Sequence, residues 1–343
     1  MPRSVGKLRM TGTRLPVNIL TGFLGSGKTT LLKRLLARPE LANTAVLVNE
    51  FGEIGLDHLL LERIADDVVL LKSGCLCCTV RGDLRDALMA LIGRRARGEI
   101  AGFDRIVIET TGLADPGPVI ATLSADPALR HQLRAGAIVT VVDAMLGEAT
   151  LDAHEESVRQ AAVADRLILT KTDLAPEDAA ARVRTRLANL NPAAPVIELR
   201  PDDAPSPGLL LADVHDDATR AGEVRRWLAA GPGRHGAVRA FALAAEQPLD
   251  WARFGLWLSM LLNRHGDRIL RLKGLVAVEG VDTPVVIQGV QHLMHAPVHL
   301  DAWPDGRPAT KLVVIAHGLD PALVERSFRA FCRVAPPAAH AAA

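Results

Sequence analysis

The sequence predicts an α/β fold in which a first domain with a mainly parallel sheet is followed by a smaller C-terminal α+β domain. Up to Leu199, short apolar runs alternate with stretches of helical composition, a pattern typical of a parallel sheet covered by helices. Proline and acidic residues then interrupt this pattern between Arg200 and Gly236. Four further strand-like runs and two helical stretches follow, which indicates a second domain.

The first domain begins with a strand, a glycine-rich loop and a helix. The strand is expected at Val17–Leu20, the glycines follow at Gly22–Gly27, and leucines recur at helical spacing over Leu31–Leu36. Later strands are expected at Ala45–Val48, Val68–Leu71, Arg105–Ile108, Ala137–Val142 and Leu167–Leu169, and helices at Arg81–Ile92, Glu155–Ala164 and Pro176–Leu187.

The expected organisation has five parts. Residues 1–15 form an N-terminal tail, 16–199 the first domain, 200–236 a linker with one or two short helices, 237–334 the second domain, and 335–343 a disordered tail. The second domain has the order βαβββα, which suits a small sheet covered on one face. Its strands are expected at Val238–Leu243, Ile269–Val278, Pro284–His292 and Lys311–Ala316, and its helices at Trp251–Arg264 and Pro321–Phe331.

Composition and charge exclude several classes of protein. The formal net charge is +1 and aromatic residues make up 3% of the chain, so the basic field and the stacking platforms that bind nucleic acids are missing. No apolar run approaches the roughly 18 to 20 residues of a membrane-spanning helix, and the N-terminus lacks the apolar core of a secretory signal. We expect a cytoplasmic protein, monomeric or weakly self-associating, without nucleic-acid or membrane partners.

The segment from Gly22 to Thr29 matches the phosphate-loop pattern of a glycine, four residues, Gly-Lys and Ser or Thr. Such a loop turns its backbone N–H groups toward phosphate oxygens, the lysine adds a cation near the terminal phosphates, and the Ser or Thr hydroxyl binds Mg²⁺. The alternative is a chance glycine-rich turn. We therefore predict a P-loop NTPase domain, with nucleotide-binding residues Gly22, Gly25, Ser26, Gly27, Lys28, Thr29 and Thr30, of which Lys28 and Thr29 are also catalytic.

The base is predicted from Thr170-Lys171-Thr172-Asp173, which follows directly on a strand. A carboxylate at Asp173 can accept two hydrogen bonds from guanine, whereas adenine offers no such pair of donors. Lys171 can lie along the ring with its aliphatic stem. The alternative is that Asp173 caps the next helix, but together with the phosphate loop the pattern favours guanine, and hence GTP and GDP.

Two further segments follow strands of the first domain. Glu109-Thr110-Thr111-Gly112 places an acid where it can hold Mg²⁺ through water, so Glu109 is predicted to be catalytic, and a glycine that lets the backbone approach the γ-phosphate. Asn49–Asp57 gathers three acids around two glycines, which indicates a nucleotide-sensing or metal-binding loop. Plain surface turns are the alternative at both places.

Three of the four cysteines form the cluster Cys75-Leu76-Cys77-Cys78, and the fourth is Cys332. A disulfide scaffold would spread its cysteines along the chain. Three thiolates can bind a soft metal and leave a fourth position for water or an acid such as Glu53. A redox pair at Cys77-Cys78 is the alternative, which the strain of a vicinal disulfide disfavours. Cys332 is expected to be a small buried hydrophobe.

Taken together, the segments Gly22–Thr30, Asn49–Asp57, Cys75–Cys78, Glu109–Pro116 and Thr170–Asp173 resemble the CobW family of metal-binding P-loop GTPases. Gln288-Gly289-Val290-Gln291 is similar to the signature of the CobW C-terminal domain, so the resemblance covers about Pro16 to Phe331. It implies a cytosolic GTPase metallochaperone that binds Zn²⁺ or Co²⁺ through the cysteines and delivers it to a client protein or pathway.

The sequence also departs from the family. The linker region holds only His215 and His235 in place of a histidine-rich stretch, and Thr170 stands where GTPases often have Asn. The group His292, His295 and His299 is a candidate metal site, with solvated histidines as the alternative. Two other functions stay open: a metal sensor or storage protein with a regulatory nucleotide site, and a P-loop kinase acting on a small molecule.

Overall fold

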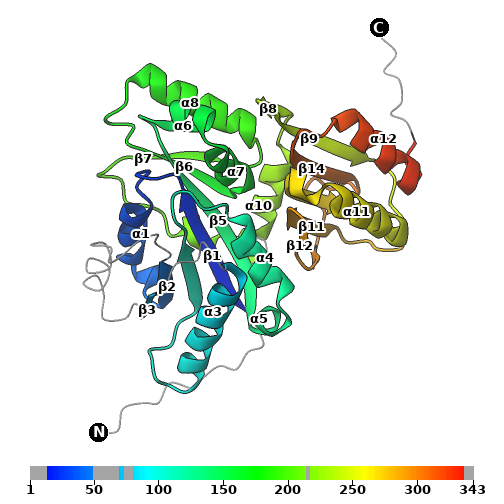
Figure 1. The fold of residues 1–343 in the computed structure, drawn as a ribbon. Coiled ribbons are helices and arrows are strands. Elements are labelled where there is room, and N and C mark those ends of the chain that lie inside the picture. Colours follow the sequence, from blue (N-terminus) through cyan, green and yellow to red (C-terminus); the bar gives the residue numbers. More distant parts are fainter. Residues whose placement is uncertain (1–13, 49–68, 73–79, 214–216, 336–343) are drawn as a thin grey trace.

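The first domain is built around a seven-stranded parallel sheet, with strand order β3-β2-β4-β1-β5-β6-β7 (Figure 1). We analysed a computed structural model, which describes residues 14–48, 69–72, 80–213 and 217–335. The strands are β1 (Leu15–Gly22), β2 (Thr44–Val48), β3 (Val69–Lys72), β4 (Arg105–Glu109), β5 (Leu133–Asp143), β6 (Arg166–Thr170) and β7 (Val196–Leu199).

Helices cover both faces of this sheet, because the strands are apolar on both sides. Leu20 of β1 packs in one cluster with the leucines of α1, whereas Val17 and Ile19 pack with α3, α4 and α7 on the other face. The helices are α1 (Lys28–Leu36), α3 (Val80–Ala96), α4 (Gly117–Ala125), α5 (Pro127–Gln132), α6 (Gly147–Ala153), α7 (Glu155–Val163) and α8 (Glu177–Leu190), with a 3₁₀ turn η1 (Pro39–Leu41).

The second sheet is antiparallel, with order β12-β11-β10-β14-β9-β8 and β13 paired to β11. The chain reaches it through α9 (Gly208–Leu211) and α10 (Asp217–Leu228). The sheet and its helices comprise β8 (Gly233–His235), β9 (Val238–Ala245), α11 (Trp251–His265), η2 (Gly266–Arg268), β10 (Ile269–Val276), β11 (Val285–Val290), β12 (Leu293–Met294), β13 (Val298–His299), β14 (Thr310–His317) and α12 (Pro321–Cys332).

The expectation that this sheet is covered on one face was wrong. Helices α11 and α12 pack on one face, where Phe254, Trp257 and Phe328 form the core. The other face is also covered, because Trp227 of α10 packs on Leu275 and Val286, and every residue of β10 is buried. The short strands β8, β12 and β13 were not expected, since runs of two or three residues carry too little periodicity to be recognised.

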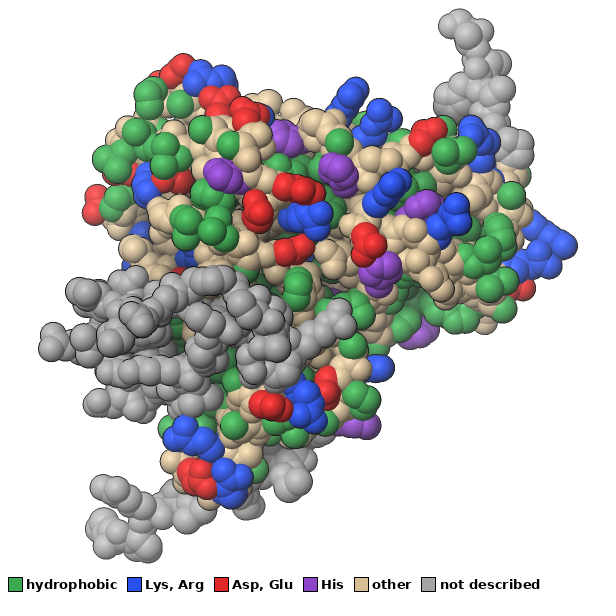
Figure 2. Space-filling model, in the orientation of Figure 1, with side chains coloured by type: hydrophobic (Ala, Val, Ile, Leu, Met, Phe, Trp, Pro, Cys, Tyr) green, Lys and Arg blue, Asp and Glu red, His purple; other side chains and the backbone are tan. Residues whose placement is uncertain are grey.

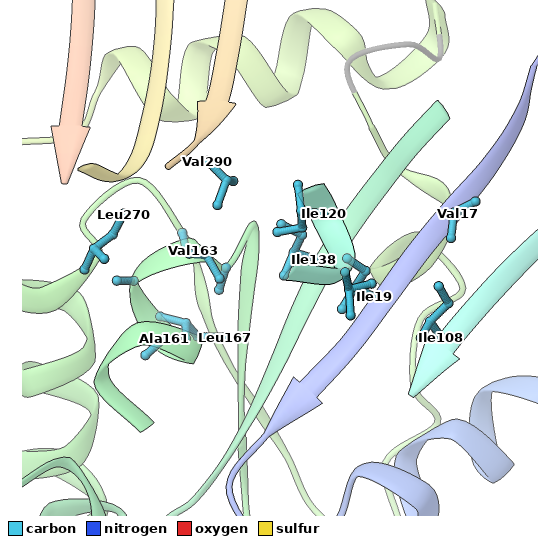
Figure 3. Packing of buried hydrophobic residues seen from close by; sticks show 14 of the residues in the cluster. Val17, Ile19, Ile108, Ile120, Ile138, Ala161, Val163, Leu167, Leu270 and Val290 are labelled. Carbon is cyan, nitrogen blue, oxygen red and sulfur yellow. The ribbon is translucent and has the colours of Figure 1, made fainter. Parts of the chain in front are cut away.

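The two sheets share a hydrophobic core at their junction. Leu270 and Val290 of the second sheet lie in one cluster with Ile120 of α4 and Val163 of α7, as Figure 3 shows. Beside this cluster, the buried carboxylate of Asp165 contacts Arg271 at 2.5 Å and Lys273 at 2.6 Å, both on β10. The junction is therefore both apolar and ionic.

On the face drawn in Figure 2, Lys and Arg side chains lie interspersed with Asp and Glu. Among the residues that the structure describes, no helix is both long enough and apolar enough to span a bilayer.

Candidate nucleotide site

The loop between β1 and α1 has a backbone that only glycine accommodates easily. Gly22, Gly25 and Gly27 have φ values of 142°, 69° and 96°, in the region that L-residues with a side chain rarely adopt. At Gly22 a Cβ would also lie 2.2 Å from the carbonyl oxygen of Val141 on β5. The glycines thus let the loop turn tightly at the carboxyl edge of the sheet.

Lys28, the first residue of α1, folds back over this loop. Its Nζ donates to the carbonyl oxygens of Gly22 at 2.9 Å and Phe23 at 3.1 Å. Burial lowers the pKa of the Lys28 ammonium, and the nearby carboxylate of Glu109 opposes that shift. A cation is therefore held inside the loop, where terminal phosphates of a nucleotide bind in this motif.

Thr29 meets Glu109 across the sheet edge. The Thr29 hydroxyl donates to Glu109 Oε1 at 2.5 Å, and the Glu109 side chain is buried at the end of β4. Strands β1 and β4 are parallel neighbours, so their carboxyl ends bring the two side chains together. A hydroxyl and a carboxylate are the hard oxygen donors that Mg²⁺ prefers, and the pair fits that ion. Thr30, the next residue on α1, is exposed.

The segment after Glu109 is tied to the phosphate loop and to α7. Thr110 donates from its backbone N to Leu20 O at 3.0 Å and from its hydroxyl to Thr21 Oγ1 at 2.8 Å. A Cβ at Gly112 would lie 2.5 Å from the backbone N of Leu24, so the segment touches the loop. Gln160 of α7 donates to the carbonyl oxygens of Gly112 and Ala114, each at 3.0 Å.

The predicted base loop begins at the end of β6, beside the phosphate loop. The Thr170 hydroxyl donates to Ser26 O at 2.7 Å and lies 3.2 Å from Val142 O. Thr170 therefore links the base loop to the phosphate loop, although it lacks the amide of the Asn that often stands there. The Asp173 side chain is exposed at the same edge, where it is open to a ligand.

Lys171 is held in an uncommon conformation by an ion pair. Its φ is 57°, and its Nζ contacts the carboxylate of Asp143 at the end of β5. The other oxygen of Asp143 accepts from the backbone N of Met145 at 2.7 Å. The sequence argument missed both Asp143 and Gln160. The position of Asp143 after an apolar run was a usable signal, whereas nothing in the sequence marked Gln160.

The predicted transition-metal ligands Cys75, Cys77, Cys78 and Glu53, and the loop Asn49–Asp57, lie outside the described residues. Within the described part of the chain, no three His, Cys, Asp or Glu side chains form a group that could hold a metal ion. His292 contacts Leu262 O at 2.9 Å and Asp267 Oδ1 at 2.8 Å, and His299 lies 3.5 Å from the hydroxyl of Thr283. These histidines are engaged with separate partners, as solvated or structural histidines are.

Two family models match the chain. Residues 16–198 match the nucleotide-binding domain described as CobW/HypB/UreG, and residues 238–332 match the cobalamin synthesis protein CobW C-terminal domain. The chain belongs to the CobW family of P-loop GTPases. The CobW C-terminal model includes Gln288–Gln291, which lies on β11 and at its end.

Several CobW-family relatives span nearly the whole chain. The zinc chaperone YjiA of Escherichia coli is 33% identical over 305 residues, which cover 88% of this chain and 93% of YjiA. The zinc chaperone CobW of Pseudomonas aeruginosa is 33% identical over 352 residues, 93% of this chain and 92% of that protein. The crystal structure of Zn(II)-bound YjiA GTPase from E. coli has a TM-score of 0.71 and 27% identity, and covers 93% of this chain and 99% of that one.

Proposed function

We propose that this CobW-family protein is a GTP-hydrolysing metallochaperone of the cytoplasm, which carries Zn²⁺, or Co²⁺, and delivers it to a client protein in a nucleotide-dependent way. The observation that carries the proposal is the convergence of the phosphate loop, Glu109 and the base loop at one edge of the parallel sheet. The assignment of a transition metal as cargo is supported by relatives that align over most of the chain and are named zinc chaperones.

In this proposal the chain's own residues bind and orient GTP. The backbone of Gly22, Gly25, Ser26 and Gly27 cradles the phosphates, and Lys28 exchanges its two loop carbonyls for phosphate oxygens. Asp173 accepts the two guanine donors, while Lys171 lies along the base with its ammonium held by Asp143. Gly112 gives the backbone access to the γ-phosphate.

Mg²⁺ would be the resident cofactor, and the Thr29 hydroxyl, with Glu109 acting through water, would hold it. When bound, this ion supplies charge neutralisation at the transferring phosphoryl group. The 2.5 Å contact between Thr29 and Glu109 keeps the two oxygens preorganised. The ammonium of Lys28 stabilises negative charge at the terminal phosphate. Because this group is already in place, it need not reorient during the reaction as water molecules would.

Zn²⁺ is the cargo, ligated by the thiolates of Cys75, Cys77 and Cys78, with Glu53 as a candidate fourth ligand. Three soft ligands with one open position suit transfer better than permanent storage. In the sequence Glu53 follows β2 and the cysteines follow β3, and both strands end at the carboxyl edge of the sheet that carries the phosphate loop. Nucleotide turnover can therefore change metal affinity through shared loops.

The test combines metal binding with nucleotide state. Protein purified anaerobically is titrated with Co²⁺ in the nucleotide-free form, with GDP, and with a non-hydrolysable GTP analogue. We expect thiolate charge-transfer absorption and a difference in Co²⁺ affinity of about 5- to 150-fold between nucleotide states, the usual range of such coupling. In parallel, phosphate release is compared for GTP and ATP, with GTP expected to be the strong substrate.

The matched control uses the remaining cysteine. Cys77→Ser should remove the absorption, whereas Cys332→Ala should retain it, because Cys332 is buried in the C-terminal domain and burial raises the pKa of its thiol to about 11. Identical Co²⁺ binding curves for the nucleotide-free, GDP-bound and analogue-bound forms would contradict nucleotide-gated delivery and favour a sensor or storage protein. ADP formation that depends on a small-molecule acceptor would indicate a kinase.

A further inference from the structure

We infer that Gln291 of the C-terminal domain is a positioning residue for the segment Gly112–Gly117, which follows Glu109, and that this contact couples the C-terminal domain to the bound nucleotide. The inference rests on the proposed GTPase function and adds a role for the second domain.

The segment is anchored at one end by the phosphate loop. Gly112 approaches Leu24 so closely that a Cβ would lie 2.5 Å from its backbone N. Any change at the terminal phosphate that moves this loop or Glu109 therefore moves Gly112 as well.

The other end of the segment meets the C-terminal domain. One oxygen of Asp115 accepts from the backbone N of Gly117 at 2.8 Å. The second oxygen faces Arg159 of α7 at 3.2 Å and the side-chain amide of Gln291 at 3.5 Å. At Gly117 a Cβ would lie 2.7 Å from that same amide, so the Gln291 side chain fills the space that a larger residue would occupy.

The backbone of Gln291 is strained where it makes this contact. Its φ is 52°, which is uncommon for a residue with a long side chain, and its backbone N donates to Ile269 O at 2.9 Å. Such strain persists only where surrounding structure holds it, and it is frequent at switching contacts. The hydrogen bond to β10 fixes the turn between β11 and β12, so Gln291 presents its amide to Asp115 from a rigid base.

Apolar packing makes the contact part of a larger joint. The preceding residue, Val290, clusters with Ile120 of α4 and Val163 of α7 (Figure 3). Helix α4 begins at Gly117, where the segment ends, and α7 carries Gln160 and Arg159, which hold the segment from the other side. A displacement of Gly112–Gly117 must therefore be accommodated by both helices and by the turn that holds Gln291.

The test shortens one side chain without changing the backbone preference. Asn is among the residues that tolerate a positive φ best, so Gln291→Asn keeps the turn and withdraws the amide from Asp115. Dissociation constants for GDP and for a non-hydrolysable GTP analogue are measured by calorimetry on the full chain. We expect the ratio of the two constants to change at least fivefold relative to wild type, with the thermal midpoint no lower than that of the wild type.

Gln247→Asn is the matched control. It removes the same methylene group from an exposed glutamine of the same domain, whose amide contacts Arg333 O at 2.9 Å, away from the junction. This variant should keep the wild-type ratio.

Hydrogen exchange supplies a second measurement that does not depend on the variant's folding. In the wild-type chain, replacing GDP by the GTP analogue should change exchange at residues 289–294 as well as at 112–117. An unchanged affinity ratio in Gln291→Asn, or unaltered exchange at 289–294 in the wild type, would overturn this inference and leave the proposed function intact. A wild-type chain that binds no guanine nucleotide would contradict both.

Discussion

The two domains bury charged side chains in different ways. In the nucleotide domain Lys28 begins helix α1 and Glu109 ends strand β4, beside glycines whose backbone leaves room for a ligand. In the C-terminal domain Arg271 and Lys273 lie within a central strand and share one carboxylate, that of Asp165, which belongs to the other domain. Charge at the first place is available for chemistry, whereas charge at the second is enclosed in the contact between the domains.

This difference identifies the role of each domain. A buried ion is tolerated only when it is paired or when a ligand pairs with it. The nucleotide domain keeps its cation against weak carbonyl partners that phosphates can replace. The C-terminal domain holds its two buried cations against a carboxylate of the other domain, so we regard it as a structural and coupling domain.

The largest expected effect comes from breaking the junction. Asp165→Ala leaves Arg271 and Lys273 buried without their carboxylate, and removing one partner of a buried ion pair costs about 3 to 5 kcal/mol. The free energy of unfolding, measured by urea denaturation, should fall by that amount. The exposed Asp202→Ala should change it by less than about 0.5 kcal/mol. Equal effects of the two variants would contradict the structural role of the junction.

The corresponding change in the nucleotide domain should affect catalysis. Lys28→Ala removes the cation held over the phosphate loop, and loss of one preorganised electrostatic group lowers kcat about 100- to 1,000-fold. Phosphate release at saturating GTP measures this. Lys33→Ala, on the same helix, should retain nearly wild-type turnover. If Lys28→Ala hydrolyses GTP at the wild-type rate, the activity belongs to another site.

The pH dependence of stability should separate the two kinds of charge. Burial and the neighbouring Arg271 lower the pKa of Lys273 to about 8, against the attraction of Asp165 and Glu223. Between pH 8 and 10.5 the unfolded chain holds more protons at this lysine than the folded chain, so its contribution to stability rises with pH. Across this pH range the free energy of unfolding of the wild type should rise by roughly 3 kcal/mol relative to that of Lys273→Met, at about 1.4 kcal/mol per pKa unit.

Denaturation curves of both proteins at pH 8 and above measure this difference. Lys33→Met replaces a lysine outside the junction. Its free energy of unfolding should differ from that of the wild type by an amount that is nearly independent of pH. If the difference in the free energy of unfolding between Lys273→Met and the wild type is also independent of pH, Lys273 is not held as a buried cation.

The smallest expected effect concerns base selection. Asp173 is exposed, and we propose that it accepts the two guanine donors, so Asp173→Ala should weaken GTP binding by about 1 to 3 kcal/mol and leave ATP binding nearly unchanged. Asp178→Ala, at an exposed acid on the following helix that pairs with Arg182, should bind GTP as the wild type does. Equal affinity of the wild type for ATP and GTP would contradict the guanine assignment.

Much of the nucleotide domain was predictable because its signals are local. The glycines of the phosphate loop, the strand before it and the helix after it are contiguous in the sequence, so their spacing alone predicts them. The alternation of short apolar runs with helices likewise predicts the parallel sheet. The C-terminal sheet was recognised less completely, because its three shortest strands depend on neighbours far along the chain.

Residue identity and spacing thus determined the fold class, the CobW resemblance and the candidate ligands Lys28, Thr29, Glu109 and Asp173. Only the tertiary structure decided which of them meet: Thr29 and Glu109 are 80 positions apart, and Thr170 and Ser26 are 144 apart. The same holds for the junction, where Asp165 and Arg271 are 106 positions apart. No local pattern reports such pairings, because strand order and domain packing, not sequence distance, bring these side chains within hydrogen-bonding range.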